Sequence, residues 1–417
     1  MKTILILGGW HATTMWFFKT QGGKGNYRLW IGDCWEQSAC RYSRYCERFF
    51  LLPNHSNELS YIDKIIEIYR TEGFDALIPI PHEEVILISK YRDRLLDAGV
   101  PVVITNYDTM QIAVDKEKLG HFCKEHGIRY PATFAGDKYT GRQILEAQGI
   151  PLIVKLKAST NQVDQMICHK PDEFLSYFEW VCRKHGRENV IAQQFINGYE
   201  LDSMFTTGVF CNRDSKILGI FSTKKIRARP YSGGAGICTK TVDEPNVENI
   251  CRKTVEAFFR WQAICNIEVK RDSVTGEYYL IEINPRAWGS PMFSITLSGV
   301  DLIDLWIRLT VGEELPSKIV LDRKGVYSTE LFHDFMLLTD LLKDLPFKAK
   351  RQKAWESLLS YKFPYFSNAD SVMLYEAIAD MDIHDLVVFW KKIIRLKKRL
   401  IYAILPINKG RKEGEYK

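Results

Sequence analysis

The chain contains 417 residues, of which 46% are hydrophobic and 26% are charged. This length allows two or three domains with cores of their own, and this composition excludes an intrinsically disordered protein and a membrane-spanning one. The net charge of +6 comes from the C-terminal end: residues 391–417 hold ten Lys or Arg and two Glu, whereas residues 1–390 hold 47 Lys or Arg and 49 Asp or Glu. Because no platform of basic and aromatic residues accompanies this charge, no nucleic-acid partner is expected.

The N-terminus and the cysteines both indicate a cytoplasmic protein. The apolar run after Lys2 ends at Gly8, which is too short for a signal peptide and suits a first buried strand. The ten cysteines form no Cys-x-x-Cys pair and stand at positions 34, 40, 46, 123, 168, 182, 211, 238, 251 and 265. Neither a zinc site nor a disulfide framework is indicated, and buried thiols in a reducing compartment are expected.

The first unit, residues 1–112, alternates short β-rich runs with helical stretches. Helical spacing covers 59–71 and 84–96, and the predicted strands are Ile4–Leu7, Arg28–Ile31, Ala76–Ile80 and Val100–Ile104. Such alternation predicts a parallel sheet covered by helices, as in a Rossmann-like α/β domain.

Two loops of this unit follow predicted strands and could approach a ligand. Gly8, Gly9 and Trp10 follow the first strand, although a Gly pair is more often a tight turn. His82, Glu83 and Glu84 follow a later strand and could line a site or cap the next helix, where carboxylates are favoured.

A second unit, residues 113–325, carries cations at places where cations need an explanation. Lys155 lies among the β-branched and apolar residues of a predicted strand, where a lysine usually has a partner. Lys116 begins a helix and could lie beside a phosphate or be an ordinary solvated residue. A basic run leads into the Gly-rich loop 231–236 and could fold over a polyphosphate; its members are Lys224, Lys225, Arg227 and Arg229.

The stretch 190–202 could hold a nucleobase. The backbone of Phe195 and Ile196 could imitate base pairing with adenine, with Gln194 at the amino group and Glu200 on the ribose hydroxyls. An ordinary hairpin turning at 197–198 is the simpler interpretation of this stretch alone.

The stretch 266–290 carries the most specific pattern. Glu282, Asn284 and Arg286 alternate along a predicted strand and therefore share a face, on which two oxygen donors could hold Mg²⁺ and the guanidinium an anion. The preceding strand contains Glu268 and Lys270, and a turn at 272–276 would pair the two strands, bringing Glu268 near Glu282 and Asn284. The alternative is an edge strand with a solvated polar face.

Together these motifs resemble the ATP-grasp superfamily over about residues 1–320. Within it, "IEVKRD" and "EINPRAWGS" are most similar to carboxylate-amine ligases related to the carbamoyl phosphate synthase large subunit. The resemblance implies a Rossmann-like pre-ATP-grasp domain, an ATP-grasp domain of two α+β subdomains and a helical region 326–417. It also implies ATP with Mg²⁺, or Mn²⁺ in its place.

The resemblance assigns roles residue by residue. Lys116 and Lys155 would contact phosphates, residues 194–196 adenine, and Glu200 ribose. The magnesium ligands would be Glu268, Glu282 and Asn284. The transferring phosphoryl group would be stabilised by Arg286 with Lys225, Arg227 or Arg229. One departure is that Ser159, Thr160 and Asn161 stand where the family usually carries a small Gly-rich loop.

The implied reaction joins a small-molecule carboxylate to an amine through an acyl phosphate, releasing ADP and phosphate. This chemistry needs alignment and charge neutralisation but no covalent nucleophile, which agrees with the lack of a Ser or Cys motif. The alternatives are a bicarbonate-activating carboxylase or carbamoylating enzyme, and a nucleotide-binding protein that has lost turnover because its phosphate loop lacks glycine.

The C-terminal stretch 386–406 predicts a basic amphipathic helix. Its apolar stripe is formed by Leu386, Phe389, Ile393, Leu396, Leu400 and Ile404, and its lysines and arginines lie opposite. Such a helix could dock on its own domain or on a second subunit of a homodimer. It could also lie on the inner face of a membrane as a peripheral contact, but its charges recur too often to span a bilayer.

Overall fold

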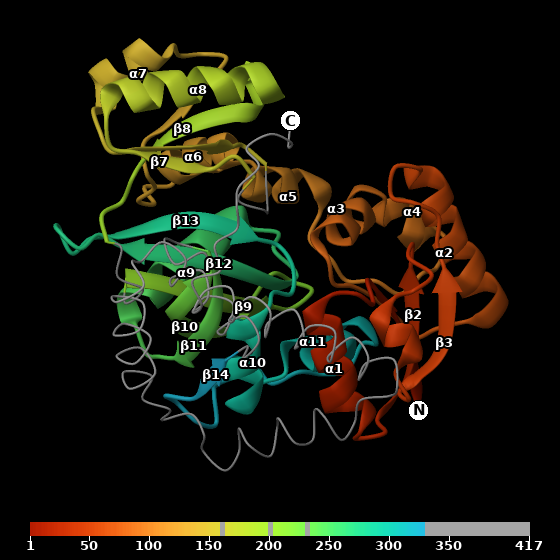
Figure 1. Ribbon diagram of the computed structural model, residues 1–417. Helices are drawn as coiled ribbons and strands as arrows, with labels where there is room; N and C mark the ends of the chain where they lie inside the picture. The colour runs from red at the N-terminus through yellow and green to blue at the C-terminus, as the bar shows by residue number, and fades with distance from the viewer. Residues whose placement is uncertain (159–162, 199–202, 230–233, 330–417) are drawn as a thin grey trace, which may run out of the picture.

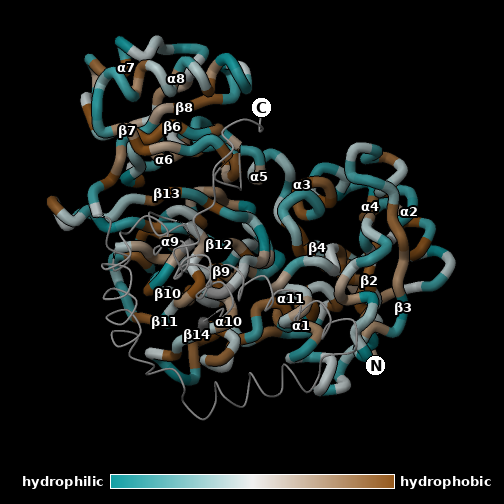
Figure 2. The backbone as a smooth tube through the Cα atoms, viewed as in Figure 1, coloured by the Kyte–Doolittle hydropathy of each residue, from teal (hydrophilic) through white to brown (hydrophobic). Residues whose placement is uncertain are grey.

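The computed structural model describes residues 1–158, 163–198, 203–229 and 234–329. Within these ranges the strands form three sheets: a four-stranded sheet β3-β2-β1-β4, a six-stranded sheet β13-β12-β9-β10-β11-β14 and a four-stranded sheet β5-β8-β6-β7 (Figure 1). Hydrophobic residues are concentrated along the sheets, and many residues of the outer loops are hydrophilic (Figure 2).

The first sheet is parallel, as the sequence predicts. Its strands are β1 (Lys2–Leu7), β2 (Tyr27–Asp33), β3 (Cys46–Leu51) and β4 (Ala76–Pro79), and each neighbouring pair is parallel. The helices of this part are α1 (Ala12–Gly22), α2 (Glu58–Glu72), α3 (His82–Lys90) and α4 (Arg92–Asp97). Ile4 to Leu7 are fully buried, because β1 lies inside the sheet with both faces covered.

Three details of this part differ from the predicted elements. Residues 100–104 form no strand: Pro101 has no N–H to donate, and its carbonyl oxygen accepts a single hydrogen bond from the Leu77 N–H, at 2.9 Å. The predicted helix 84–96 is divided between α3 and α4 at Tyr91. Strand β3 was not predicted, since its partly exposed residues lack a clean alternation.

The six-stranded sheet is antiparallel and has different partners on its two faces. Its strands are β9 (Met204–Cys211), β10 (Ile217–Arg229), β11 (Ala235–Thr241), β12 (Ala263–Arg271), β13 (Tyr278–Asn284) and β14 (Tyr327–Thr329). One face packs on α9 (Pro245–Phe258). The other face, which includes Phe210 and Ile264, shares a core with α10 (Ser290–Leu297), α11 (Leu302–Thr310) and the first sheet.

The third sheet forms the part drawn at the top of Figure 1. It contains β5 (Thr133–Ala135), β6 (Leu152–Leu156), β7 (Met166–Cys168) and β8 (Val190–Gln194), and it packs on α7 (Gly141–Gln148) and α8 (Pro171–His185). Helices α5 (Tyr107–Val114) and α6 (Lys116–Glu125) connect the first sheet to it. Because β8 belongs to this sheet and β9 to the six-stranded one, the hairpin interpretation of 190–202 is wrong.

Long-range hydrogen bonds fix the first sheet against the six-stranded part. The Thr13 hydroxyl donates to the Trp288 carbonyl oxygen at 2.8 Å, and the Trp306 indole N–H donates to the Val103 carbonyl oxygen at 2.7 Å. The Tyr27 hydroxyl donates to Asp304 at 2.8 Å. The C-terminal ends of β1 to β4, called the carboxyl edge below, are thereby held beside the loop that follows β13.

Gly8 is required at the end of β1 for two reasons. Its φ is +83°, and a Cβ added to it would lie 2.1 Å from Cγ of Pro81, the residue before α3. We expect Gly8→Ala to lower the free energy of unfolding by about 3 kcal/mol or more, from backbone strain plus the clash. Denaturant unfolding should show a much smaller loss for Gly25→Ala, because Gly25 has a φ of +67° but no neighbour within 4 Å. Equal losses would contradict the role of Pro81.

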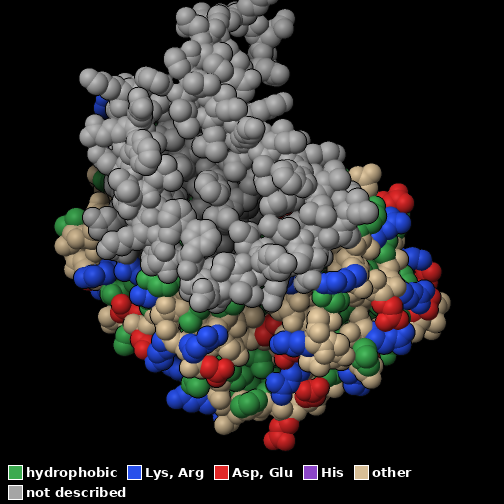
Figure 3. Space-filling view, turned by 60° about the horizontal axis from the view of Figure 1, so that its bottom comes forward, with side chains coloured by type: hydrophobic (Ala, Val, Ile, Leu, Met, Phe, Trp, Pro, Cys, Tyr) green, Lys and Arg blue, Asp and Glu red, His purple; other side chains and the backbone are tan. Residues whose placement is uncertain are grey.

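Some predicted features involve residues outside the described ranges. The basic helix 386–406 lies outside them, and so do Glu200 and residues 159–161. Strand β14 pairs with β11 just before residue 330, so the predicted helical region 326–417 begins with strand residues. In the described part of the chain no helix is long and apolar enough to cross a membrane. On the part of the surface that the grey atoms of Figure 3 do not cover, Lys and Arg side chains are mixed with Asp and Glu side chains.

Candidate nucleotide and metal site

The hairpin β12–β13 pairs the polar residues as predicted. Glu268 lies directly opposite Glu282, and Asn266 lies opposite Asn284. The Asn284 side-chain N–H donates to a Glu282 carboxylate oxygen at 2.9 Å. Ile283 lies between Glu282 and Asn284 and belongs to the core under α9, so alternation places the two oxygen donors on the opposite face. Leu280 belongs to the same core because the register of the hairpin shifts between Leu280 and Glu282. Strand β13 is the edge strand of its sheet, as the alternative interpretation expected, but Asn284 on its polar face is buried, so this face is not a solvated one.

Lys225 of β10 is the cation that contacts this oxygen cluster. Its Nζ lies 2.9 Å from both carboxylate oxygens of Glu268, and its side chain is almost fully buried. Burial and the nearby Glu282 raise the pKa of Glu268, and Lys225 opposes them. Arg227 lies further along β10, opposite Cys238 of β11, whereas only the backbone of Arg229 is described.

Lys155 of β6, in the third sheet, and Lys116, at the start of α6, both act on the oxygen cluster. Both are buried, at 7% and 6% exposure, so the interpretation of Lys116 as an ordinary solvated residue is wrong. Burial and the charge of Lys116 lower the pKa of Lys155 to about 7, while Glu282 and Glu268 act in the other direction. Burial alone would raise the pKa of Glu282, but Lys116, Asn284, Lys155 and Lys225 together hold it below its ordinary value. Three lysines and two carboxylates thus share one electrostatic site.

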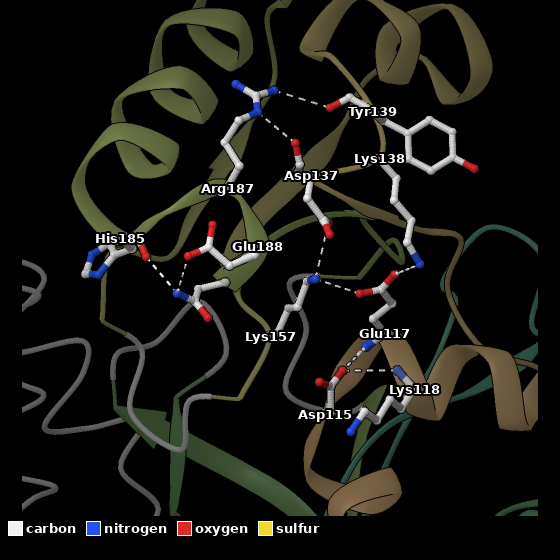
Figure 4. A network of polar contacts seen from close by, with 12 residues as sticks. Asp115, Glu117, Lys118, Asp137, Lys138, Tyr139, Lys157, His185, Arg187 and Glu188 are labelled. Atoms are coloured by element: carbon white, nitrogen blue, oxygen red, sulfur yellow. Dashed lines mark hydrogen bonds and ion pairs between the residues drawn. The ribbon is translucent and has the colours of Figure 1, made fainter.

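The start of α6 is fixed by a second network (Figure 4). Asp115 caps the helix by accepting hydrogen bonds from the N–H groups of Glu117 and Lys118, at 2.9 and 3.0 Å. Lys157 of the segment after β6 contacts Glu117 at 2.7 Å and Asp137 at 3.4 Å. The Lys116 N–H donates to the Lys157 carbonyl oxygen at 3.1 Å. This bond fixes the start of α6, and therefore Lys116, against the segment that follows β6, the strand that contains Lys155.

Loss of the cap should therefore affect both stability and nucleotide affinity. We expect Asp115→Ala to lower the free energy of unfolding by about 1 kcal/mol, the usual effect of losing an N-cap, and to weaken ATP binding. Thr140→Ala, which removes the N-cap of α7, is the matched control. Calorimetric titration with ATP should show weaker binding for Asp115→Ala and unchanged binding for Thr140→Ala; equal affinities would show that the cap does not position Lys116.

The predicted adenine segment lies at the join between the third sheet and the hairpin. Phe195 and Ile196 are buried, at 8% and 3% exposure. The Gln194 side-chain oxygen accepts from the Ala132 N–H at 3.3 Å, and the Phe195 N–H donates to the Pro151 carbonyl oxygen at 3.3 Å. Those two groups are thus already used inside the protein. Lys270 lies over the Phe195 ring at 4.5 Å, and burial lowers its pKa to about 8.

Arg286 lies between the oxygen cluster and the carboxyl edge, since Glu282 and Glu268 on one side and Glu83 on the other all oppose the lowering of its pKa by burial. Its Nη1 donates to the Ala287 carbonyl oxygen at 2.9 Å, and its buried Nε has no hydrogen-bond partner among the described residues. Burial and Arg286 lower the pKa of His11 to about 4, and the same two causes lower the pKa of His82. His82 was among the residues predicted to line a site, whereas His11 was not, because its position in the loop after Gly8 and Gly9 does not by itself indicate a nearby Arg286.

The donor set suits a hard cation that brings further ligands with it. Glu268, Glu282 and Asn284 supply carboxylate and amide oxygens, the ligands that Mg²⁺ prefers. Over the described residues no three His, Cys, Asp or Glu side chains meet as a ready-made metal site. A cation held here would therefore complete its coordination with other oxygens, such as those of a polyphosphate.

Comparison with known proteins gives one family model and many distant relatives. Residues 237–318 match the model of the carbamoyl-phosphate synthase L chain, ATP binding domain. The C-terminal section of the carbamoyl phosphate synthase large chain of Methanocaldococcus jannaschii is 22% identical over 232 residues, which cover 54% of this chain and 37% of the relative. The match thus spans little more than a third of the relative's length.

Solved structures share the fold more completely. N5-carboxyaminoimidazole synthetase of Staphylococcus aureus gives a TM-score of 0.61 at 17% identity, covering 83% of this chain and 87% of that one. L-amino acid ligase of Bacillus licheniformis gives 0.58 at 16% identity, covering 76% of each chain. The biotin carboxylase domain dimer of Hydrogenobacter thermophilus 2-oxoglutarate carboxylase, in complex with MgADP and bicarbonate, gives 0.60 at 16%, covering 78% and 73%. The predicted α/β fold class and the resemblance to ATP-grasp proteins are confirmed.

Proposed function

We propose that the chain is an ATP-dependent ligase that joins a carboxylate to an amine through an acyl phosphate, releasing ADP and phosphate. The observation that carries the proposal is the convergence of two opposed carboxylates, Glu268 and Glu282, with three lysines from different elements: Lys225 of β10, Lys155 of β6 and Lys116 at the start of α6. Burying these charges together is costly for a fold, which favours a role in holding a polyanion with its cation over a role in stability.

Each group of site residues would bind a different part of Mg-ATP or of the transferring group. Lys116 and Lys155 would hold the phosphates, and the segment from Gln194 to Ile196 would line the base, with Glu200 on the ribose. Mg²⁺, or Mn²⁺ in its place, would be held by Glu268, Glu282 and Asn284 and would neutralise the charge of the phosphates. Arg286 and Lys225, with Arg227 or Arg229, would face the transferring phosphoryl group.

In the first step an oxygen of the substrate carboxylate attacks the γ-phosphorus, and the bond to ADP breaks. The positive charge of Arg286 and Lys225 stabilises the charge that spreads over the phosphoryl oxygens. In the second step the amine attacks the acyl carbon and phosphate leaves. The residues align the reactants and neutralise charge, so no covalent enzyme intermediate is needed.

The test is ADP release from the purified chain with ATP and Mg²⁺, against pools of amino acids, other amines, small carboxylates and bicarbonate. ADP formed only when both a carboxylate and an amine are present, and lost on chelation of the metal, supports the ligase. ADP formed with bicarbonate alone would favour a carboxylase. ATP binding without metal-dependent turnover in any pool would favour the nucleotide-binding protein that has lost activity. Replacing Mg²⁺ by Mn²⁺ tests the choice of metal.

The partners proposed are the two small-molecule substrates and a second copy of the chain. The dimeric state of the 2-oxoglutarate carboxylase domain supports a homodimer, with the basic tail as a docking helix. Light scattering of the full chain and of a chain ending at residue 385 tests both points. Binding of the full chain to anionic vesicles, lost on the same truncation, would instead favour a peripheral membrane contact.

A further inference from the structure

A second group of charged residues lies along the carboxyl edge, outside the nucleotide and metal site. The chain passes from β1 outward through β2 and β3 and then returns to β4 on the other side of β1. In open α/β sheets, ligands bind at the carboxyl ends of the strands next to such a reversal. The residues at this edge include Asp33, the last residue of β2, His55 in the loop after β3, and the first turn of α3 after β4.

Buried acceptors without partners are the unusual feature of this group. Asp33 and Glu84 are 3% and 4% exposed, yet among the described residues neither Oδ2 of Asp33 nor Oε2 of Glu84 has a hydrogen-bond partner. Their other oxygens are used: Oδ1 of Asp33 accepts from the Trp35 N–H at 3.0 Å, and Oε1 of Glu84 lies 3.0 Å from His55 Nε2. A buried carboxylate oxygen left unpaired costs free energy, so a ligand that donates to it is favoured.

The same place contains a hydroxyl group without a partner. Tyr61 is fully buried, and its hydroxyl has no hydrogen-bond partner within the part of the chain that the structure describes. Its ring centroid lies 5.1 Å from that of His55. Burial raises the pKa of Tyr61 well above its ordinary value, and the nearby Glu84, Cys34 and Asp33 add to this effect. Two carboxylate oxygens and one phenol oxygen therefore belong to one buried group of neighbouring residues. Each of them can accept a hydrogen bond, and an ammonium group has three N–H donors to offer.

The first turn of α3 connects this acidic group to the proposed reaction site. His82 and Glu84 are two residues apart, so they project to different sides of the helix, roughly 200° around it and about 10 Å apart. Burial and the charge of Arg286 lower the pKa of His82, so His82 lies on the side of the helix that is nearer to Arg286 and the proposed site of phosphoryl transfer. The charge of Glu83 acts to raise the pKa of His11 and that of His55, so Glu83 lies between the side of the helix that carries His82 and the side that carries Glu84.

We infer that the carboxyl edge binds a zwitterionic substrate whose carboxylate lies toward Arg286 and whose cationic amino group contacts Asp33 and Glu84. This inference rests on the proposed function and names the class of its carboxylate substrate. The separation fits an amino group several bonds from the carboxylate, as in an ω-amino acid, a diamino acid or a short peptide. The amino group bound here does not react, because carboxylates stabilise its protonated form.

The test compares matched compounds that differ only in the charged amino group. The probes are 6-aminohexanoate, L-lysine and glycylglycine, and their counterparts are hexanoate, Nε-acetyl-lysine and N-acetyl-glycylglycine. Calorimetric titration of the full chain, with and without Mg-ADP, measures affinity. At least one probe is expected to bind about tenfold more tightly than its counterpart, since ammonium–carboxylate hydrogen bonds are among the strong ones.

Two isosteric variants and one control locate the contact. Asp33→Asn and Glu84→Gln are expected to remove the preference for the charged probe, whereas Asp97→Asn, at the exposed end of α4, is expected to keep it. The thermal midpoint of ligand-free Asp33→Asn is expected not to fall, because the amide removes an unpaired buried charge and keeps the oxygen that accepts from Trp35. A residue that served only the fold would destabilise the chain when changed.

The outcomes separate this inference from the proposed function. Equal affinity for probes and counterparts, or a preference that survives Asp33→Asn, overturns the zwitterion site while leaving ATP-dependent ligation intact. A preference lost in Asp33→Asn, together with no ADP release from any substrate pool, upholds the site and contradicts the ligase. Binding confined to the wild type and Asp97→Asn, with ADP release, upholds both.

Discussion

Replacing Glu282 by Gln is expected to lower the rate of metal-dependent ADP release by about a thousandfold, with little change in the fold. Glu282 is the carboxylate on which Lys116, Lys155 and Lys225 all act, and it lies opposite Glu268 in the hairpin. The amide keeps the shape of the side chain and an oxygen for Asn284, but it removes the charge that attracts a divalent cation. Metal affinity and turnover should therefore fall together.

The measurement is the initial rate of ADP release across a range of Mg²⁺ concentrations, for the substrate pair found with the wild type. Glu256→Gln is the control, because Glu256 lies on the exposed side of α9 and loses the same charge. Its rate should equal that of the wild type. If Glu282→Gln keeps more than about a tenth of the wild-type rate at every Mg²⁺ concentration, Glu282 is not a metal ligand and the proposed ligand set is wrong.

The pattern of apolar and polar residues within a single segment was enough to predict those parts of the fold that depend on that segment alone. The apolar runs of β1, β2 and β4 predicted buried parallel strands, and alternation at the end of β13 predicted that Glu282 and Asn284 share a face. The failures had non-local causes. The run 100–104 has the composition of a strand, but Pro101 and the Trp306 contact leave it without a ladder. The turn at Gly198 resembled a hairpin, yet its two strands belong to different sheets.

The candidate site shows the same division. The pairing of Glu268 with Glu282 follows from one hairpin and could be predicted from the sequence. That Lys225 would contact Glu268 could not, because β9 lies between β10 and β12 and the contact crosses it. His11 was missed because a histidine in a loop is uninformative until the sheet places its loop beside Arg286. The assigned roles of all these residues remain predictions that the variants test.

Replacing Lys155 by Met is expected to stabilise the ligand-free chain while weakening ATP binding. Burial and Lys116 lower the pKa of Lys155 from 10.5 to about 7. As pH falls from 10.5 toward 7, the unfolded chain binds a proton that the folded chain does not, so the cost to stability grows and is fully present below pH 7. Removing the amino group should raise the free energy of unfolding by about 1–2 kcal/mol at pH 6 and by almost nothing above pH 10.5.

The same pKa makes nucleotide binding depend on pH. The phosphates of ATP add negative charge beside Lys155 and raise its pKa, so binding at pH 8 should take up a proton and affinity should fall as pH rises from 7 to 9. Calorimetry in two buffers with different ionisation enthalpies measures that proton, and denaturant unfolding at pH 6 and pH 8 measures stability. Lys170→Met, at an exposed lysine of the same subdomain, should keep both the affinity and the proton uptake of the wild type. If Lys155→Met retains both, Lys155 does not contact the phosphates, and its burial has a cause within the fold.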